Sequence, residues 1–324
     1  MTMLLVAGSG GHLTQLMELS TRIVGADNRL WVTDKTPQSE SLLEAESVLF
    51  ADHTAPRDLI GVLRNATLIY RMTRHLPISG IVSTGAGIAL SAALVGRLRS
   101  IPFAYIESAT RLSALSLTGK LLNLTPGVRR FTQYEHFVNK RWRKFPSIFD
   151  QYMATPGALE PPRKLKVLVT FGANQHAGFR RLAEHLVNLL PDDFEVFWQT
   201  GPTDLAGLDI VAHTMISSEK MGRIIRESDV VICHAGTGSA LMALSNGKLP
   251  VFVPRRADFG EHVDGHQHEL ADLLQSLGLA LVREAGDVTL QDLYSAASYS
   301  IDRIENPERA NLFSEDLSKN NRGP

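Results

Sequence analysis

The feature that most constrains this chain is a repeated unit: a short apolar run, then glycine, then a stretch with helical periodicity. The runs at 3–7 (MLLVA), 80–84 (GIVST) and 230–234 (VVICH) each lead into a glycine-containing turn. After the second run, the pattern predicts a helix over 88–98 and a strand over 103–106. Short apolar strands that alternate with helices are typical of parallel sheets covered by helices. The sequence therefore predicts an α/β fold.

The units form two series, separated by a proline-rich segment. Residues 154–164 (ATPGALEPPRK) contain three prolines and little apolar sequence, which is typical of an interdomain linker. We predict one Rossmann-like domain over residues 1–158 and a second over 159–305 that ends in a helix over 289–304. A polar tail follows over 306–324. Two such domains bring the carboxyl ends of two sheets to a shared cleft.

Charge is distributed unevenly along a nearly neutral chain. Residues 1–160 carry 17 Lys and Arg against 12 Asp and Glu, or +5, whereas residues 161–324 carry 16 against 22, or −6. This balance excludes a generally basic nucleic-acid binder and predicts a different partner for each half. Cys233 is the only cysteine, which excludes a disulfide framework and a cysteine-based zinc site. Without a basic leader or an apolar run of 18 residues, we expect a cytoplasmic protein.

The first glycine turn, GSGGH at 8–12, lies between a predicted strand and a predicted helix. Glycine lets the backbone turn sharply and brings N–H groups close to an anion at the positive helix end. A tight turn without a ligand is the alternative. A neutral His12 could accept a proton from a hydroxyl or bind a phosphate, or it could cap the helix. Asp34 lies near the place of a ribose-binding acid, but the third glycine of a dinucleotide fingerprint is missing.

Further candidate residues follow other strands. Thr84 and Gly85 belong to a second strand-to-glycine turn, and Glu107 comes directly after the strand FAYI. A carboxylate there could face the cleft as a base, bind sugar hydroxyls, or be a solvated loop residue. The segment CHAGTGS at 233–239 offers successive N–H groups and two hydroxyls at a helix start, which suits a diphosphate.

Three histidines fall within the loop at 260–269 (GEHVDGHQHE). A metal site would need His262 and His266 one helical turn apart, and Gly265 interrupts that spacing. A polar loop that binds sugar and ribose hydroxyls fits better. We therefore expect no metal ion.

Two basic amphipathic stretches could contact a membrane surface. Residues 57–76 interleave four arginines with apolar side chains, and residues 105–145 carry eight Lys and Arg against two Glu. Such stretches attract anionic lipid headgroups. An ordinary core-packed helix with a solvated basic face is the alternative.

Longer stretches resemble a known family. The segment at 83–122 (STGAGIALSAALVGRLRSIPFAYIESATRLSALSLTGKLL) resembles the membrane-side subunit of the eukaryotic two-subunit N-acetylglucosaminyltransferase, which extends a dolichol-diphosphate sugar. The segments at 167–182 and 234–271 resemble its catalytic partner and equivalent bacterial polysaccharide enzymes. The bacterial peptidoglycan N-acetylglucosaminyltransferase is a more distant relative. The resemblance implies a GT-B glycosyltransferase of the family 28 type, with two Rossmann-like domains facing each other across a cleft.

The resemblance also implies the reaction. The enzyme would be inverting, would use a UDP-sugar, and would need no metal or other cofactor. Its acceptor would be a polyprenyl-diphosphate-linked saccharide at the inner face of the cytoplasmic membrane, in cell-surface polysaccharide or glycan synthesis. We expect peripheral contact with anionic lipid and no nucleic acid partner.

Motifs and resemblance together give a set of expected site residues. Either His12 or Glu107 would be the catalytic base. The acceptor would contact Gly10, Gly11, Thr84 and Gly85. The donor would contact Gly172, His234, Gly236, Thr237, Gly238, Ser239, His266, Gln267 and Glu269. The helix start at 236–239, with Arg255 or Arg256, would carry the charge of the departing UDP.

One position departs from the family pattern. Relatives have a ribose-binding glutamate on the helix after HAGTGS, where this chain has Met242. Either Glu269 or another group takes over ribose binding, or the donor site is altered, or activity is reduced. A UDP-sugar epimerase of similar architecture and a nonenzymatic nucleotide-sugar or lipid-binding subunit are the alternative functions. The sugar remains open among GlcNAc, glucose, galactose and glucuronate.

Overall fold

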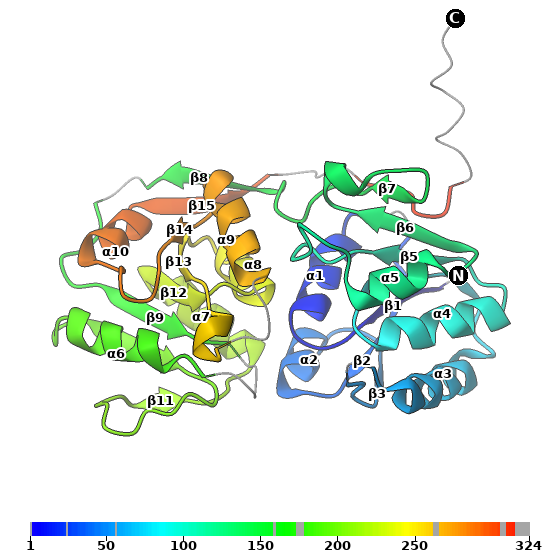
Figure 1. The fold of residues 1–324 in the computed structure, drawn as a ribbon, viewed down its shortest axis with the longest axis horizontal. Helices are drawn as coiled ribbons and strands as arrows, with labels where there is room; N and C mark the ends of the chain where they lie inside the picture. The colour runs from blue at the N-terminus through cyan, green and yellow to red at the C-terminus, as the bar shows by residue number, and fades with distance from the viewer. Residues whose placement is uncertain are drawn as a thin grey trace, which may run out of the picture.

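The computed structural model describes residues 2–23, 25–55, 57–157, 160–172, 178–261, 266–304 and 309–314. The chain forms two α/β lobes, each built around a parallel sheet (Figure 1). This arrangement agrees with the fold predicted from the repeated strand–glycine–helix units.

The first domain contains a seven-stranded parallel sheet. Its strands, in spatial order, are β3 (Val48–Ala51), β2 (Arg29–Asp34), β1 (Thr2–Ala7), β4 (Ile78–Gly85), β5 (Phe103–Ile106), β6 (Val128–Thr132) and β7 (Trp142–Lys144). Its helices are α1 (Gly11–Ser20), α2 (Pro37–Leu42), α3 (Leu59–Thr73), α4 (Ile88–Leu98) and α5 (Leu117–Asn123). Because side chains alternate along a strand, Leu5 of β1 packs in the cluster that contains α1, and Leu4 packs in the cluster that contains α3 and α4. The sheet is therefore covered on both faces.

The second domain repeats this plan with a six-stranded parallel sheet. Its strands, in spatial order, are β11 (Ala212–His213), β10 (Glu195–Gln199), β9 (Lys166–Thr170), β12 (Val230–His234), β13 (Pro250–Val253) and β14 (Leu281–Val282). Its helices are α6 (Arg180–Leu189), α7 (Ser218–Glu227), α8 (Thr237–Ser245), α9 (His266–Ser276) and α10 (Leu290–Ala297). The apolar runs of β9 and β12 lie side by side at its centre, so both are almost fully buried.

A two-stranded antiparallel ribbon differs from the prediction. β8 (Tyr152–Pro156) pairs with β15 (Tyr299–Arg303), and Ile301 lies opposite Ala154. The helix predicted over 289–304 was therefore wrong in its second half, and the segment predicted as a linker begins inside a strand. Pairing between residues about 150 positions apart overrides the local helical pattern.

The chain returns to the first domain after β15. Ala310 pairs with Ile23, and the side chain of Leu312 is buried in the first domain's core. The guanidinium of Arg129 donates to the main-chain oxygens of Leu312 and Ser314. The segment expected to be a polar tail thus contains an anchor at 309–314. The predicted boundary at 158/159 and residues 315–324 lie outside the described residues.

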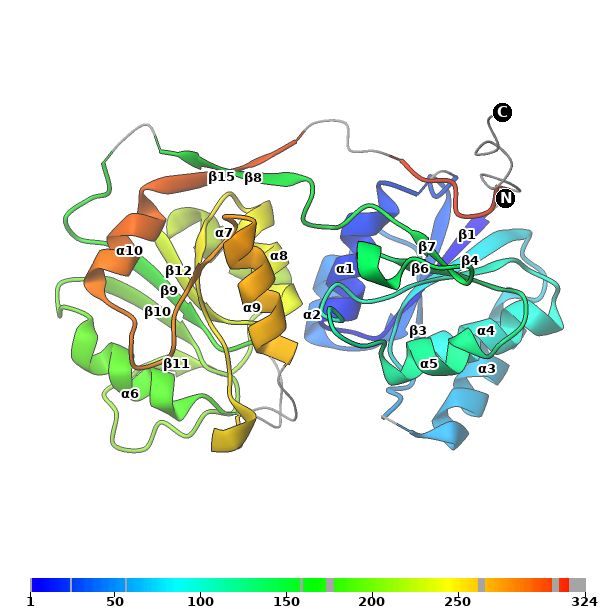
Figure 2. The same cartoon turned by 45° about the horizontal axis from the view of Figure 1, so that its top comes forward.

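The two lobes contact each other through several helices. In both views α1 of the first domain lies beside α8 of the second, and α2 packs against α7 (Figures 1 and 2). The main-chain N–H of Glu219 donates to Ser41 Oγ across this boundary at 3.2 Å. Among the residues described, no helix is long and apolar enough to cross a bilayer.

Candidate active site

The two glycine turns meet where the domains touch. Gly11 begins α1, Gly238 lies in the first turn of α8, and a Cβ atom on Gly11 would lie 3.7 Å from Gly238 N. Gly10, which precedes α1, has φ +83°, a backbone conformation that favours glycine. The positive ends of two helix dipoles therefore lie next to each other, an arrangement that favours an anion.

Thr237 lies at this junction of the two helix starts. It is 5% exposed, and its Oγ1 has no hydrogen-bond partner within the described part of the chain. Buried polar atoms are almost always paired, so an unpaired hydroxyl beside two helix starts is typical of a place that a polar ligand completes. Thr237 and Gly238 thus lie where an anion is favoured, and their contact with the donor diphosphate stays a prediction.

His12 is held in a defined orientation. Its Nδ1 lies 2.9 Å from the main-chain oxygen of Thr84, and Thr84 Oγ1 donates to the His12 oxygen at 2.8 Å. Because a carbonyl oxygen only accepts hydrogen bonds, Nδ1 carries the proton and Nε2 keeps its lone pair. Burial lowers the pKa of His12, and the positive charge of Arg111 lowers it further, against the opposing effect of the Thr84 hydrogen bond. The neutral imidazole can therefore act as a base near neutral pH.

Thr84 and Gly85, at the end of β4, lie directly against His12. The side chain of Thr84 is fully buried and bonds to the main chain of His12, so it is not an exposed contact for an acceptor. Gly85 has φ +129°, and a Cβ atom there would lie 2.8 Å from Cε1 of His12. Glycine is required at position 85 because the ring lies directly against the backbone.

Glu107 lies in a different environment from the one expected. It is 2% exposed, and its carboxylate accepts from the Tyr105 hydroxyl, the Ser108 N–H, and both the N–H and Oγ of Ser116. Burial raises the pKa of this carboxyl group, and the hydrogen bonds oppose that shift. The two carboxylate oxygens of Glu107 already accept four hydrogen bonds, so this side chain organises the loop that follows. These contacts do not favour Glu107 as the base.

In the second domain, His234 supports the glycine turns. Its imidazole lies against Gly172 and Gly236, where an added Cβ atom would come within 2.4 Å and 2.5 Å of the ring. Its Nδ1 lies 3.2 Å from Ser239 Oγ in α8. His234 thus fixes two turns and the first part of α8 relative to one another.

The start of α9 contributes two predicted residues in ways that the sequence did not indicate. Gln267 is largely buried, and its Oε1 accepts from the Arg255 N–H at 2.9 Å. Glu269 accepts from the N–H of Ser113 at 3.1 Å and from its Oγ at 2.5 Å, across the domain boundary. His266 begins α9, but its side chain, like residues 262–265, lies outside the described part of the chain.

The basic residues after β13 are committed to contacts within their own domain. Arg255 is 1% exposed, donates to the Phe171 oxygen at 2.8 Å, and lies over the ring of Phe179. Burial lowers its pKa to about 10, so it stays charged at neutral pH. Arg256 forms an ion pair with Glu284. These contacts fix the end of β13 and the turn before Gly172.

Met242 packs against the apolar core, so α8 presents no carboxylate at that position. The ribose contact implied by the family pattern is therefore missing from this part of α8. Among the residues described, no group of three His, Cys, Asp or Glu could hold a metal ion.

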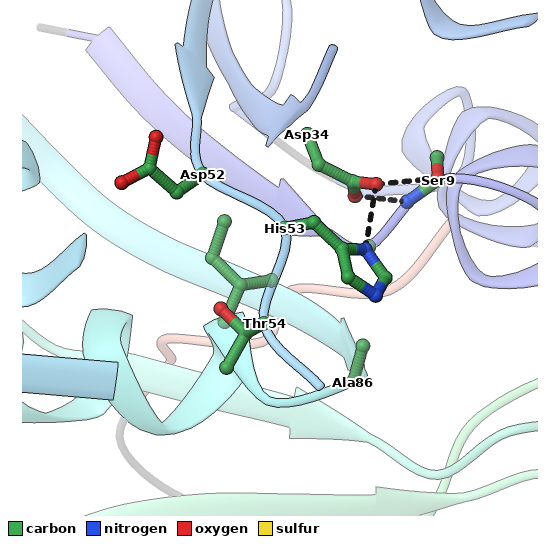
Figure 3. Close-up of a pocket in the computed structure, with 8 residues that line it drawn as sticks. Ser9, Asp34, Asp52, His53, Thr54 and Ala86 are labelled. Carbon is green, nitrogen blue, oxygen red and sulfur yellow. Dashed lines mark hydrogen bonds and ion pairs between the residues drawn. The ribbon is translucent and has the colours of Figure 1, made fainter. Parts of the chain in front are cut away.

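Sequence reasoning missed the role of Asp34. Its carboxylate accepts from the N–H of Ser9 at 2.6 Å and from its Oγ at 2.7 Å, and it lies 3.3 Å from His53 Nδ1 (Figure 3). Burial by itself would raise the pKa of Asp34, but these hydrogen bonds hold it below its usual value. The three residues line a small pocket beside the first glycine turn. Asp34 thus fixes the turn that leads to His12, at the position where a complete dinucleotide fingerprint would have a ribose-binding acid.

Comparisons with known proteins agree with this geometry. Residues 166–312 match the family model described as the glycosyltransferase family 28 C-terminal domain. A UDP-N-acetylglucosamine–N-acetylmuramyl-(pentapeptide) pyrophosphoryl-undecaprenol N-acetylglucosamine transferase from Aquifex aeolicus is 34% identical over 166 residues, covering 49% of this chain. In that match the chain spans 44% of the relative's length.

Two further matches extend along most of the chain. A transferase of the same description from Synechococcus sp. (strain CC9311) is 25% identical, covering 90% of this chain and 87% of the relative. The crystal structure of MurG from Acinetobacter baumannii has a TM-score of 0.55 and 20% identity, covering 91% of this chain and 88% of that one. Residues 166–312 are therefore similar to the family 28 C-terminal domain, and the GT-B fold predicted from the sequence is confirmed.

Proposed function

We propose, from the family 28 C-terminal domain over residues 166–312 and the GT-B fold around it, that this chain is an inverting glycosyltransferase. It moves a sugar from a UDP-sugar to a saccharide on a polyprenyl diphosphate. The observation that carries the proposal is the meeting of the α1 and α8 starts beside a neutral His12. The relatives from Aquifex aeolicus and Synechococcus carry names of transferases that act on a pyrophosphoryl-undecaprenol acceptor.

In the proposed reaction, His12 is the base. Its Nε2 takes the proton from an acceptor hydroxyl, and the hydroxyl oxygen attacks the anomeric carbon of the donor sugar. The bond from that carbon to the phosphate oxygen breaks, and the electron pair leaves with UDP. Attack opposite the departing phosphate inverts the anomeric configuration. Holding both reactants in one cleft removes most of the entropy cost of bringing them together.

The α8 start binds the departing diphosphate in this proposal. Main-chain N–H groups at Thr237 and Gly238 and the dipole of α8 favour negative charge there, and Thr237 Oγ1 gains a partner. The proposed chemistry requires no metal ion or other cofactor, because these groups stabilise the charge that develops on UDP. Gly10 and Gly11 at the α1 start face the acceptor diphosphate.

The acceptor's lipid requires contact with a membrane surface, and one face of the first domain suits this. Helices α3, α4 and α5 lie next to one another (Figure 1), and each carries both exposed apolar side chains and exposed basic residues. The apolar ones are Leu59, Ile60, Leu63, Leu94, Leu98, Leu117, Leu121 and Leu124. The basic ones include Arg64, Arg71, Arg97 and Lys120. We propose that this α3–α5 face contacts anionic lipid.

A turnover assay tests the proposed activity. The full chain is incubated in detergent with a polyprenyl-diphosphate-linked sugar and each of four donors: UDP-GlcNAc, UDP-glucose, UDP-galactose and UDP-glucuronate. We expect sugar transfer from one donor, with inversion at the anomeric carbon. Transfer to no acceptor, together with interconversion of UDP-sugars, would instead establish the epimerase alternative.

A matched pair of histidine variants tests the role of the base. His12→Ala should lower turnover about 10²- to 10⁴-fold and leave UDP binding nearly unchanged, since the imidazole acts on the acceptor. His213→Ala removes an exposed histidine of the second domain and should leave turnover unchanged. Equal turnover in both variants would exclude His12 as the base.

A further inference from the structure

We infer that the pocket beside the first glycine turn binds a hydroxyl group of the acceptor's sugar, with His53 as the contacting residue and Asp34 as the residue that orients it. The inference rests on the proposed function and adds a sugar subsite that neither the motifs nor the comparisons assign. It places the acceptor's sugar next to His12, the proposed base.

The pocket lies at the carboxyl edge of the first sheet, where four neighbouring strands end. It is lined by Gly8 and Ser9 after β1, Asp34 at the end of β2, residues 52–54 after β3, and Ala86 and Ile88 after β4. It encloses roughly 320 Å³ of empty space, solvent at its mouth included, near the lower end of the range of about 300–1,000 Å³ for small-molecule sites. This volume suits a single sugar unit.

The walls of the pocket pack closely because two positions lack a side chain. A Cβ atom on Gly8 would lie 2.7 Å from Cβ of Ala86, and one on Gly87 would lie 2.6 Å from Cγ2 of Thr54. Ala86 itself has φ +65°, which is uncommon for a residue other than glycine. Such strain persists only where the surrounding structure holds it, and it is concentrated at ligand-binding sites.

The segment that carries His53 is anchored by a buried side chain of α3. Asn65 is fully buried, and its Oδ1 accepts from the Asp52 N–H at 3.1 Å. Its Nδ2 donates to the Asp52 oxygen and to Thr54 Oγ1, both at 2.8 Å. These bonds hold the residues before and after His53. The imidazole therefore projects from a fixed backbone, which lowers the entropy cost of binding a ligand.

His53 faces Asp34 with one ring nitrogen and keeps the other for a ligand. Nδ1 lies 3.3 Å from Asp34 Oδ2, and a carboxylate only accepts hydrogen bonds, so Nδ1 carries a proton. The side chain of His53 is 76% exposed, and Figure 3 shows its other nitrogen turned away from Asp34. Because a hydroxyl group both donates and accepts, it can bind Nε2 in either protonation state.

The charge of the pocket favours a hydroxyl group over a phosphate. Among the described residues that line it, Asp34 and Asp52 are acidic and none is Lys or Arg. Burial would raise the pKa of Asp34, but hydrogen bonds from Ser9 and His53 hold it below its usual value, so the carboxylate is ionised at neutral pH. Negative charge repels a diphosphate and attracts the hydrogen of a hydroxyl group. The pocket therefore suits the sugar and not the diphosphate of the acceptor.

The pocket shares two turns with the proposed base. Ser9 comes three residues before His12, and Ala86 follows Gly85, whose backbone lies against the His12 ring. Every described residue that lines the pocket belongs to the first domain, whereas the expected donor contacts belong to the second. A sugar held here is therefore the acceptor's.

Binding measurements on the full chain test the inference without depending on turnover. The probes are geranyl diphosphate and the same compound carrying glucose, galactose or N-acetylglucosamine, so that the two classes differ only in the sugar. We expect at least one sugar-bearing probe to bind more tightly than geranyl diphosphate. His53→Ala should weaken binding of that probe about 3- to 10-fold, the scale of one hydrogen bond, and leave geranyl diphosphate unchanged. His53→Gln should recover part of the loss, because an amide also donates and accepts.

The control is His75→Ala, which removes an exposed histidine that precedes β4, at the opposite edge of the sheet, and should change neither affinity. The inference is overturned if no sugar-bearing probe binds more tightly than geranyl diphosphate. It is also overturned if His53→Ala leaves the sugar-dependent gain unchanged or weakens both classes of probe equally. If sugar transfer occurs in spite of such a result, the pocket assignment fails and the proposed function stands. If the sugar-dependent loss occurs and yet no sugar is transferred, the proposed function fails and the sugar pocket stands.

Discussion

The imidazole of His12 donates from Nδ1 to the main-chain oxygen of Thr84, 2.9 Å away, at the end of a neighbouring strand. This contact joins α1 to β4 and fixes which nitrogen keeps a lone pair. The main chain of Thr84 thus orients the proposed base, so a side-chain substitution at Thr84 would not remove this hydrogen bond. The first prediction concerns the pH at which this base acts.

Burial and the charge of Arg111 lower the pKa of His12 below its ordinary value of 6.5. A base must be neutral to accept a proton, so kcat/KM should fall as pH falls through this lowered pKa. The acid limb of the pH–rate profile should therefore lie below pH 6.5, with a plateau at neutral pH. An acid limb above pH 7 would contradict the assignment of His12 as the neutral base.

Gly85→Ala should damage catalysis through His12. The new Cβ atom would lie 2.8 Å from the imidazole Cε1, so the ring must move from its hydrogen bond to Thr84. We expect kcat to fall by about 10²-fold, the scale of a misplaced general base. Gly278→Ala is the control, because it also has positive φ but no neighbour within 4 Å of its Cβ position. If both variants lost turnover to a similar extent, backbone strain alone would explain the effect of Gly85→Ala.

Glu107→Gln should change how stability depends on pH. A carboxyl group with a raised folded-state pKa stabilises the fold fully below its unfolded pKa, and this contribution is lost as pH rises through the folded pKa. Burial raises the pKa of Glu107 above 4.5. The free energy of unfolding of the unmodified chain, relative to the Gln variant, should therefore decrease as pH rises above 4.5.

Urea unfolding at several pH values measures this difference for Glu107→Gln. The control is Glu135→Gln, which changes an exposed carboxylate and should leave the pH dependence unchanged. A relative stability that increases with pH would mean that the folded-state pKa of Glu107 is depressed.

Liposome flotation tests the α3–α5 face. Replacing Leu59, Ile60 and Leu63 by serine should reduce binding to vesicles that contain anionic lipid, because these side chains are 61–74% exposed and have apolar surface to bury. Binding of the unmodified chain should weaken at high salt, since screening reduces its attraction to lipid headgroups. Val211→Ser, at a 91% exposed site of the second domain, is the control. Salt-insensitive binding to neutral vesicles would contradict the proposed surface.

Leu312→Ala should destabilise the chain by about 2–5 kcal/mol, because it removes a buried side chain that returns to the first domain's core. Thermal unfolding and urea unfolding measure the loss. Leu277→Ala makes the same substitution at a 47% exposed leucine and should cost far less. Equal effects in the two variants would show that the 309–314 anchor contributes little to stability.

Local patterns were sufficient for elements that form a continuous apolar run next to a turn signal in the sequence. The helix predicted over 88–98 and the strand predicted over 103–106 coincide with α4 and β5. β15 could not be found in this way, because its partner β8 lies about 150 residues earlier. The anchor at Leu312 was missed for the same reason, since its surrounding sequence is polar and its contacts are all distant.

The sequence by itself determined two α/β domains, because its repeated strand–glycine–helix units are local properties of the chain, and the GT-B class followed from the resemblance of its longer motifs to a known family. It also drew attention to the residues at the starts of α1 and α8. Only the tertiary structure decided what several of them do: Glu107 is enclosed by four donors, Gln267 binds the backbone at Arg255, and Glu269 reaches Ser113 in the other domain. Residue type gives a side chain its possible chemistry. Burial and hydrogen-bond partners select among those possibilities, and both depend on residues distant in sequence.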